Sequence, residues 1–216
     1  MFWSQTVTER RAVLRADFDI GRQFEAIEES CIPSYAHSNP FAAWVSWTRL
    51  TSAAKMYEKH APEGDVLDFG SATGELAHLI PQRGQYHFIE ENQMLASALK
   101  KWKLDARQLD LSDLPKGAYS AVFALDSLEH NTEVATLVDC LEDALSPSGV
   151  LILSGPTENF LYRLGRRIAG FNGHYHHQTI MDIEEIFHDK MSLVDRAIVP
   201  MGIPLFAISV WRRKSP

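Results

Sequence analysis

Residues 65–80 read DVLDFGSATGELAHLI. A short apolar run comes first, a glycine-containing turn follows it, and the last part has helical spacing. The pattern predicts a strand over 65–70 and, after the turn, a helix over 74–80 that Pro81 ends. Ligands of open α/β sheets bind beyond the carboxyl ends of the strands, so this turn is the first place to look for a site.

The rest of the chain repeats this alternation. The predicted strands are 85–91, 106–110, 119–125, 150–155, 191–199 and 204–213, and the predicted helices are 92–102, 132–145 and 181–190. Such a rhythm predicts an α/β fold with a mostly parallel sheet and helices on both faces. The last two strands have no helix between them, so one of them should run antiparallel at the edge. Residues 1–60 show helical spacing around 5–30 and 41–60, broken by prolines, and no clear strand.

The composition is that of an acidic chain with a sizeable apolar share. Of 216 residues, 45% are hydrophobic and 23% are charged, and the net charge is −7. These fractions exclude a disordered chain, and they disfavour a general nucleic-acid binder, which needs a basic surface. The N-terminus lacks the pattern of a signal peptide, the apolar stretch 197–211 is too short to span a bilayer, and the two cysteines form no CxxC pair. We therefore expect a soluble cytoplasmic protein.

The glycine turn argues against a ligand that contains phosphates. A dinucleotide fingerprint needs a third glycine where this chain has Glu75, and an acidic residue there opposes a pyrophosphate at a helix N-terminus. Carboxylates stand at three successive strand ends: Asp68, then Glu90 with Glu91, then Asp110. Glu90 and Glu91 are well placed for two ribose hydroxyls, and Asp110 or the next backbone amide for an adenine. We expect a nucleoside-like ligand that is cationic or zwitterionic.

Five segments resemble the successive motifs of class I S-adenosylmethionine-dependent methyltransferases: LDFGSATG, FIEENQML, QLDLSDLP, AVFALDSLEH and LEDALSPSGVLILSGP. The last two are similar to the branch with coenzyme-Q-type and other small-molecule enzymes. The resemblance implies a Rossmann-like, seven-stranded sheet whose last strand inserts antiparallel, with S-adenosylmethionine as cofactor and S-adenosylhomocysteine as product. The chain departs from the family at Ala72, where glycine is common, and at Ser120, where an acidic residue is usual.

The resemblance also implies roles for residues. It assigns Glu90 to the ribose, Asp110 with Leu111 to the adenine, and the segment after strand 119–125 to the methionine end. The full expected cofactor set is Asp68, Gly70, Ser71, Ala72, Gly74, Glu90, Glu91, Asp110, Leu111, Asp126 and Ser127. Family members commonly cover the pocket with N-terminal helices and an insertion after the fifth strand. We therefore expect a helical cap over 1–60 and a methyltransferase domain over 61–216, with a lid at about 157–180.

The candidate bases are histidines. His130 follows the most apolar predicted strand, in a segment that lies near the active site in family members, although it could be a structural histidine that hydrogen-bonds a neighbouring loop. His174 and His177 belong to a second histidine cluster, for which a substrate-pocket role, a metal site and an ordinary loop remain open. We predict no metal, because no carboxylate or cysteine lies near that cluster in the sequence.

Residues 156–171 predict a basic amphipathic helix in an acidic chain. Arg163, Arg166 and Arg167 lie off its apolar stripe. Either the stripe packs on the core and the arginines face water, or the segment is a lid whose arginines meet an anionic or lipid-linked acceptor at a membrane surface. The expected acceptor-side residues are Tyr35, His37, Trp44, Glu158, Tyr162 and Arg163, with core packing as the alternative for Trp44.

Together these observations favour a methyltransferase that acts on a small-molecule or lipid-linked acceptor, at oxygen rather than carbon or nitrogen. The alternative is a non-catalytic S-adenosylmethionine-binding regulator or scaffold of the same fold; the intact loop and carboxylates favour the enzyme. The glycine spacing argues against a nicotinamide-dependent oxidoreductase. Peripheral membrane contact and the oligomeric state are left open.

Overall fold

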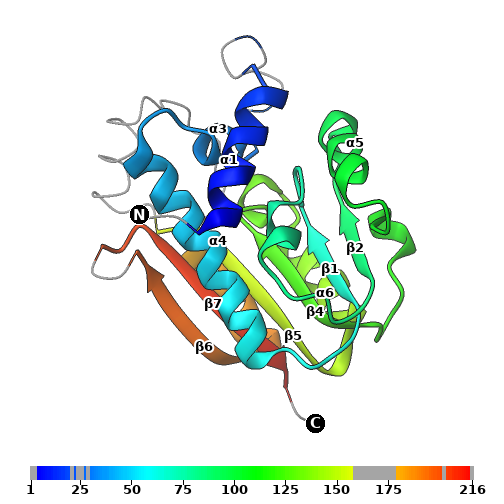
Figure 1. The fold of residues 1–216 in the computed structure, drawn as a ribbon. Coiled ribbons are helices and arrows are strands. Elements are labelled where there is room, and N and C mark those ends of the chain that lie inside the picture. The colour runs from blue at the N-terminus through cyan, green and yellow to red at the C-terminus, as the bar shows by residue number, and fades with distance from the viewer. Residues whose placement is uncertain are drawn as a thin grey trace.

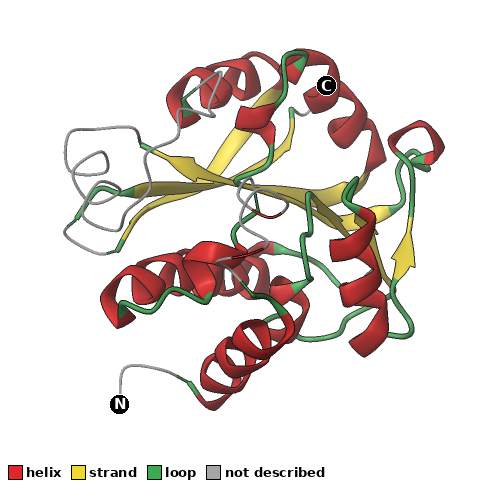
Figure 2. Ribbon diagram, turned by 90° about the horizontal axis from the view of Figure 1, so that it is seen from above, coloured by secondary structure: helices red, strands yellow, loops and turns green. Residues whose placement is uncertain are grey.

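A twisted sheet divides the molecule into two helical layers (Figures 1 and 2). This computed structural model describes residues 4–19, 22, 27, 30–157, 179–200 and 203–214. The seven strands lie in the order β3-β2-β1-β4-β5-β7-β6. Their bounds are Val66–Phe69 (β1), Tyr86–Ile89 (β2), Arg107–Gln108 (β3), Tyr119–Leu125 (β4), Leu145–Pro156 (β5), Met191–Val199 (β6) and Phe206–Arg213 (β7).

The sheet has the expected class I topology. Strands β1 to β5 pair in parallel, and β7 runs antiparallel to both β5 and β6. The antiparallel pair of β6 and β7 therefore forms one edge, which confirms the predicted fold class. The antiparallel strand itself lies one place in from that edge, so β6 is the outermost strand.

Helices of the first layer come mainly from the N-terminal part of the chain, and those of the second layer from the C-terminal part. The α-helices are α1 (Gln5–Asp17), α3 (Ile32–Tyr35), α4 (Pro40–His60), α5 (Gln93–Trp102), α6 (Val134–Ala144) and α8 (Ile180–Lys190), and three short 3-10 turns are η1 (Glu75–His78), η2 (Leu111–Asp113) and η3 (Leu128–His130). Pro40, which interrupts the helical spacing in the sequence, is the first residue of α4. Asn39 caps that helix by accepting from the N–H of Phe41 (2.9 Å).

Each face of the sheet has its own core. Residues of α1, α3, α4 and α5 pack on one face, and residues of α6 and α8 on the other. On β4, Ala121 and Phe123 point to the first core, whereas Val122 and Ala124 point to the second. Both faces of the strand are buried, so its sequence is continuously apolar instead of alternating.

The segment after β1 differs from its prediction. A helix was expected over 74–80, but only the single 3-10 turn η1 forms there. Its N-cap residue Gly74 adopts a left-handed conformation and offers no side chain to cap the turn. Pro81 follows closely, and so short a segment forms too few helical hydrogen bonds to stabilise a longer helix.

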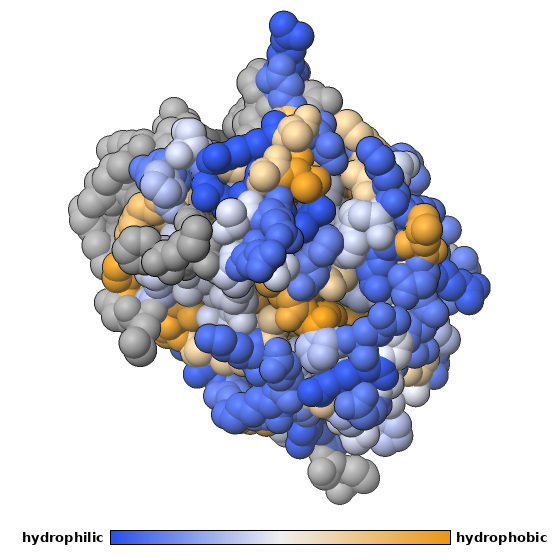
Figure 3. All heavy atoms as spheres, in the orientation of Figure 1, coloured by the Kyte–Doolittle hydropathy of each residue, from blue (hydrophilic) through white to orange (hydrophobic). Residues whose placement is uncertain are grey.

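The surface seen in Figure 3 is mostly polar, with hydrophobic side chains in small separate patches. The most exposed large apolar residues are Leu104, Met181 and Phe41. Across the described ranges, no helix combines the length and the apolar character that crossing a membrane requires.

Candidate active site

A glycine turn at the end of β1 brings three strand ends together. Gly70 has φ +73°, and its N–H donates to the carbonyl oxygen of Ile89 at the end of β2 (2.9 Å). A Cβ on Gly70 would lie 2.5 Å from the Cβ of Ser127, which follows β4. Both the positive φ and this close approach require glycine, because any larger residue would be strained and would displace the neighbouring loop.

The other end of the turn approaches α5. Gly74 has φ +76°, and a Cβ there would lie 2.7 Å from the Cγ of Leu99. The sequence predicts a helix that begins at Gly74; the glycine instead lets a short turn pack against α5. Ala72 also has a positive φ, 47°, and its N–H donates to the Oε2 of Glu90 (2.8 Å). This bond stabilises the alanine in a conformation that usually favours glycine.

The Glu90 carboxylate joins the turn to the start of α5. Its Oε1 accepts from the N–H of Asn92 (2.9 Å), while its Oε2 accepts from Ala72. Asn92 caps α5, because its side chain accepts from the N–H of Met94 (3.1 Å). Burial raises the pKa of Glu90, the two backbone bonds lower it and the charge of Glu91 raises it, with a net increase. The carboxylate is thus held in place with lone pairs left for a ligand.

Asp68 is a buried carboxylate on β1, 3% exposed. Tyr86, at the start of β2, donates its hydroxyl hydrogen to the Oδ2 of Asp68. Burial raises the pKa of Asp68 to about 7; the bond from Tyr86 lowers this pKa and the charge of Glu90 raises it further. A cation bound nearby would favour the ionised form.

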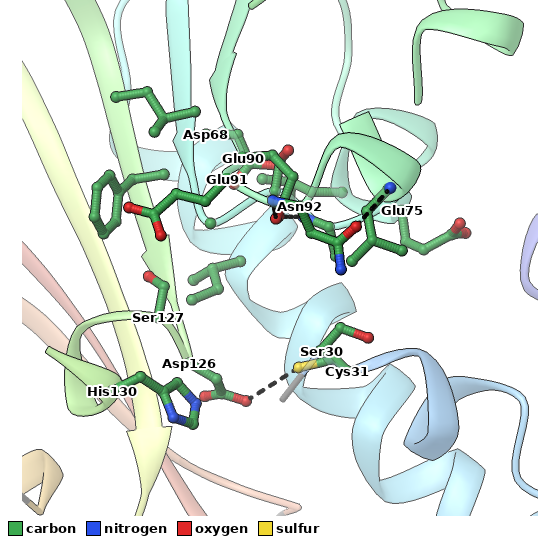
Figure 4. A pocket seen from close by; sticks show the side chains of 18 of the residues that line it. Ser30, Cys31, Asp68, Glu75, Glu90, Glu91, Asn92, Asp126, Ser127 and His130 are labelled. Atoms are coloured by element: carbon green, nitrogen blue, oxygen red, sulfur yellow. Dashed lines mark hydrogen bonds between the residues drawn. The ribbon is translucent and has the colours of Figure 1, made fainter. Parts of the chain in front are cut away.

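These groups line a cavity of about 560 Å³ at the carboxyl ends of β1, β2 and β4. In Figure 4, the side chains of Glu90 and Asn92 lie toward one end. Those of Asp126 and His130 lie toward the other, facing Cys31. The position of the cavity is the one that parallel α/β sheets use for ligands.

At the second end, several neighbours hold the Asp126 carboxylate. Asp126 has φ +51°; its N–H donates to the carbonyl oxygen of Ser154 on β5 (2.9 Å), and the Ser154 hydroxyl donates to its Oδ1 (3.1 Å). Its Oδ2 forms an ion pair with Arg49 of α4 and accepts from the Sγ of Cys31 (3.8 Å). The partners of Asp68 and Glu90, by contrast, are a phenol and backbone amides.

Glu75, which follows the glycine turn, is also paired. Arg10 of α1 donates to both of its carboxylate oxygens (2.8 and 2.9 Å), and the Thr73 hydroxyl donates to Oε1 (3.1 Å). Its charge is therefore balanced, and the element it opens is a single 3-10 turn. Glu75 therefore repels a phosphate less than the sequence suggested. The carboxylates of Asp68 and Glu90, whose partners are a phenol and backbone amides, would repel a phosphate instead.

Two buried hydroxyls add to the polar lining. The Oγ atoms of Ser71 and Ser127 have no hydrogen-bond partner within the part of the chain that the structure describes, and both residues line the cavity. Buried hydroxyls are normally paired, so a polar ligand would satisfy them. Together with the carboxylates, they fit the sulfonium, ammonium and ribose groups of S-adenosylmethionine.

The structure brings most of the predicted cofactor residues to this cavity. Its lining includes Asp68, Gly70, Ser71, Ala72, Glu90, Glu91, Asp126 and Ser127. Gly74 packs on α5 behind the turn. Asp110 and Leu111 are at the start of η2 and do not line the cavity, so their contact with an adenine stays a prediction.

The predicted acceptor-side residues and catalytic histidines are divided. Tyr35 and His130 line the cavity. His37 and Trp44 do not: the Nδ1 of His37 accepts from the N–H of Asn39 (3.0 Å), and Trp44 packs on the first core with its ring 5.5 Å from that of Phe41. Five predicted residues lie outside the described ranges: Glu158, Tyr162, Arg163, His174 and His177. The described residues include no group of three or more His, Cys, Asp and Glu side chains placed to hold a metal ion.

Sequence reasoning missed Arg49, Cys31 and Tyr86. One signal was available for Arg49: it interrupts the apolar face of its helix, four residues after Val45 and four before Ala53. A charge at such a position must be paired when buried. The sequence does not show with what, because the partner lies far along the chain.

A family model described as a methyltransferase domain matches residues 41–190, more than half of the chain. No curated protein matches the sequence. Three solved structures with similar folds each have a TM-score of 0.64. Magnesium protoporphyrin IX methyltransferase (ChlM) from Synechocystis PCC 6803, with bound S-adenosylhomocysteine, is 17% identical, with 94% of this chain and 100% of that chain covered.

The second structure is the N-methyltransferase NodS from Bradyrhizobium japonicum WM9 in complex with S-adenosylhomocysteine, at 14% identity over 82% of this chain and 90% of that one. The third is the PH0226 protein from Pyrococcus horikoshii OT3, at 15% identity over 84% and 96%. At these identities the likeness concerns the fold. The residues matched by the family model contain the glycine turn and the cavity's carboxylates, so the chain belongs to the methyltransferase-domain family, as a class I, S-adenosylmethionine-dependent enzyme.

Proposed function

We propose that this methyltransferase transfers a methyl group to an oxygen atom of a small-molecule acceptor, with His130 as the base. The observation that carries the proposal is one cavity with a carboxylate-lined end and a histidine at the other end. Two structural neighbours, an N-methyltransferase and a magnesium protoporphyrin IX methyltransferase, support a small-molecule acceptor.

At the first end, the carboxylates bind the nucleoside part of the cofactor, whose methionine part extends toward Asp126 at the second end. Glu90 accepts hydrogen bonds from ribose hydroxyls with the lone pairs that Ala72 and Asn92 leave available. Asp68 supplies a negative charge to the cationic part of the ligand. S-adenosylmethionine, when bound, supplies an electrophilic methyl group.

At the second end, His130 takes the acceptor's proton. A hydroxyl becomes a good nucleophile only as its proton leaves, whereas a neutral amine can attack without a base. A histidine that lines the cavity therefore favours an oxygen acceptor. The cavity walls align the acceptor and exclude water, which supplies a further part of the rate.

The proposal that the acceptor is lipid-linked is based on Arg163, Arg166 and Arg167, which lie outside the described ranges. Its support is the concentration of three positive charges within five residues of an acidic chain. Such a cluster offers charge-assisted contacts to an anionic headgroup. Turnover that rises when the acceptor is presented in anionic vesicles would support this form over a free metabolite.

Calorimetry with S-adenosylhomocysteine tests the cofactor end. We expect binding in the micromolar range, roughly −8 kcal/mol, for the unaltered protein. Gly70→Arg fills the turn and should abolish binding while thermal unfolding stays cooperative. The matched control is Gly117→Ala: its φ is +68° as well, but nothing lies within 4 Å of the added Cβ, so binding should persist. Equal affinity of Gly70→Arg and the unaltered protein would overturn the assignment.

Turnover tests the rest of the proposal. Isotopically labelled S-adenosylmethionine is incubated with the protein and metabolite fractions, and mass spectrometry follows the labelled product. Nuclear magnetic resonance of that product then identifies the methylated atom. A product methylated at nitrogen or carbon would contradict the oxygen assignment. Cofactor binding with no methylated product from any fraction would favour a non-catalytic regulator or scaffold.

A further inference from the structure

We propose that Arg49 is a positioning residue, which balances the charge of the Asp126 carboxylate and holds it in one orientation at the end of the cavity where His130 lies. The inference rests on the proposed function, because it concerns how the same cavity holds the methionine part of its cofactor. Arg49 is not part of the cavity lining, so it acts through Asp126.

Arg49 is deeply buried. The residue is 4% exposed and lies on the face of α4 that packs on the sheet. The buried residues Ser46, Leu50 and Ala53 lie on the same face. A buried ion pair is weak evidence for stability, since an apolar side chain of similar volume often stabilises such a position as well. The charge at this position therefore calls for a second explanation.

Neighbouring side chains fix the orientation of the Arg49 guanidinium. Its Nη2 donates to the Sγ of Cys31 (3.2 Å) and to the hydroxyl oxygen of Tyr35 (3.1 Å), and its Cζ lies 4.8 Å from the ring centroid of Phe206. These contacts hold the planar group so that Nη1 meets Asp126. The Nε has no hydrogen-bond partner among the described residues, as expected if orientation toward Asp126 takes precedence over complete pairing.

Asp126 has an unusual backbone conformation. A non-glycine residue at φ +51° is strained, and such residues persist where their surroundings hold them, often at functional sites. Ser154 on β5 holds its backbone N–H and its Oδ1, and Arg49 holds its Oδ2. The result is a carboxylate in a defined place on the cavity wall. Without the arginine, this carboxylate would lose its balancing cation and one of the contacts that orient it.

The experiment is a double-mutant cycle on affinity for S-adenosylhomocysteine, measured by calorimetry on the full chain. Arg49→Met should weaken binding about 10–100-fold, as expected for a lost charge-assisted contact. Asp126→Asn should weaken binding to a similar extent. If Arg49 acts through Asp126, the double variant should bind no more weakly than Asp126→Asn alone. Arg49→Lys, which retains the charge, should recover most of the affinity.

A control and a folding check complete the design. Arg196→Met removes a bidentate ion pair with Glu184 outside the cavity and should leave binding unchanged. If Arg49→Met does not fold, the double variant, which lacks both charges, is compared with Asp126→Asn; equal affinities support the proposal. Additive losses, or full affinity in Arg49→Met, would overturn it. No binding by the unaltered protein would instead overturn the proposed function.

Discussion

Tyr86 on β2 donates its hydroxyl hydrogen to Asp68 on the neighbouring strand β1. The register explains the contact: Val66 pairs with Tyr86, and Asp68, two residues further along β1, presents its side chain to the same face. Both residues are buried. The bond lowers the pKa of Asp68, whereas burial raises it, and the balance leaves that pKa at about 7. The charge of this cavity-lining carboxylate is therefore sensitive to pH near neutrality.

The first prediction is a pH dependence of cofactor affinity. In the proposed function, the ionised form of Asp68 pairs with the cationic part of the ligand, so affinity should rise with pH as the carboxyl loses its proton. With the pKa of Asp68 at about 7, affinity for S-adenosylhomocysteine should increase about tenfold between about pH 6 and about pH 8. Asp68→Asn should flatten this profile. Calorimetry at several pH values measures it.

Removal of the Tyr86 hydroxyl tests how its hydrogen bond affects the pKa of Asp68. Tyr86→Phe deletes a bond that lowers the pKa of Asp68, so the midpoint of the profile should move to higher pH. Tyr57→Phe is the matched control, because the buried Tyr57 hydroxyl has no hydrogen-bond partner among the described residues. A midpoint that does not move in Tyr86→Phe would contradict this account.

The second prediction concerns the base. His130→Ala should slow turnover by about 10²–10⁴-fold and change affinity for S-adenosylhomocysteine little. His188→Ala removes a histidine on α8 that packs on Trp211 and does not line the cavity, so its turnover should stay near that of the unaltered protein. Steady-state kinetics with the identified acceptor measures both. A fully active His130→Ala variant would return His130 to a structural role.

The third prediction concerns the stability of the contact between α1 and the glycine turn. Arg10→Met leaves Glu75 buried without its cation and should lower the free energy of unfolding by about 3–5 kcal/mol. The double variant with Glu75→Gln should regain most of this loss. Arg22→Met breaks an exposed pair with Asp19 and should change the free energy by less than about 0.5 kcal/mol. Denaturant titration compares them, and equal effects of the Arg10 and Arg22 variants would refute the buried pairing.

The fourth prediction concerns the arginines of the predicted lid. Replacement of Arg163, Arg166 and Arg167 by Gln should raise KM for the acceptor and leave affinity for S-adenosylhomocysteine intact. Salt should weaken acceptor binding in the unaltered protein more than in this variant, because it screens the charged contacts that the variant lacks. An unchanged KM would favour the interpretation in which the arginines face water.

Several elements could be predicted from the sequence because their signals are local. The bounds of β4 and β6 coincide with the predicted strands 119–125 and 191–199. Asn92 caps α5 through backbone groups within three residues of it. The glycine turn and the strand-end carboxylates could be read in the same way, because parallel strands bring their carboxyl ends to one edge of the sheet.

The tertiary structure alone decided which of these charges are balanced. Glu75 is neutralised by Arg10, and Asp126 by Arg49, across separations in sequence that no local pattern encodes. Leu99 of α5 leaves no room for a side chain at Gly74, and this contact likewise depends on how two separate segments pack. Periodicity and capping involve neighbours along the chain, so the sequence by itself determines them. A buried charge instead takes its partner from whichever segment the completed fold places beside it, and its energy depends on that partner.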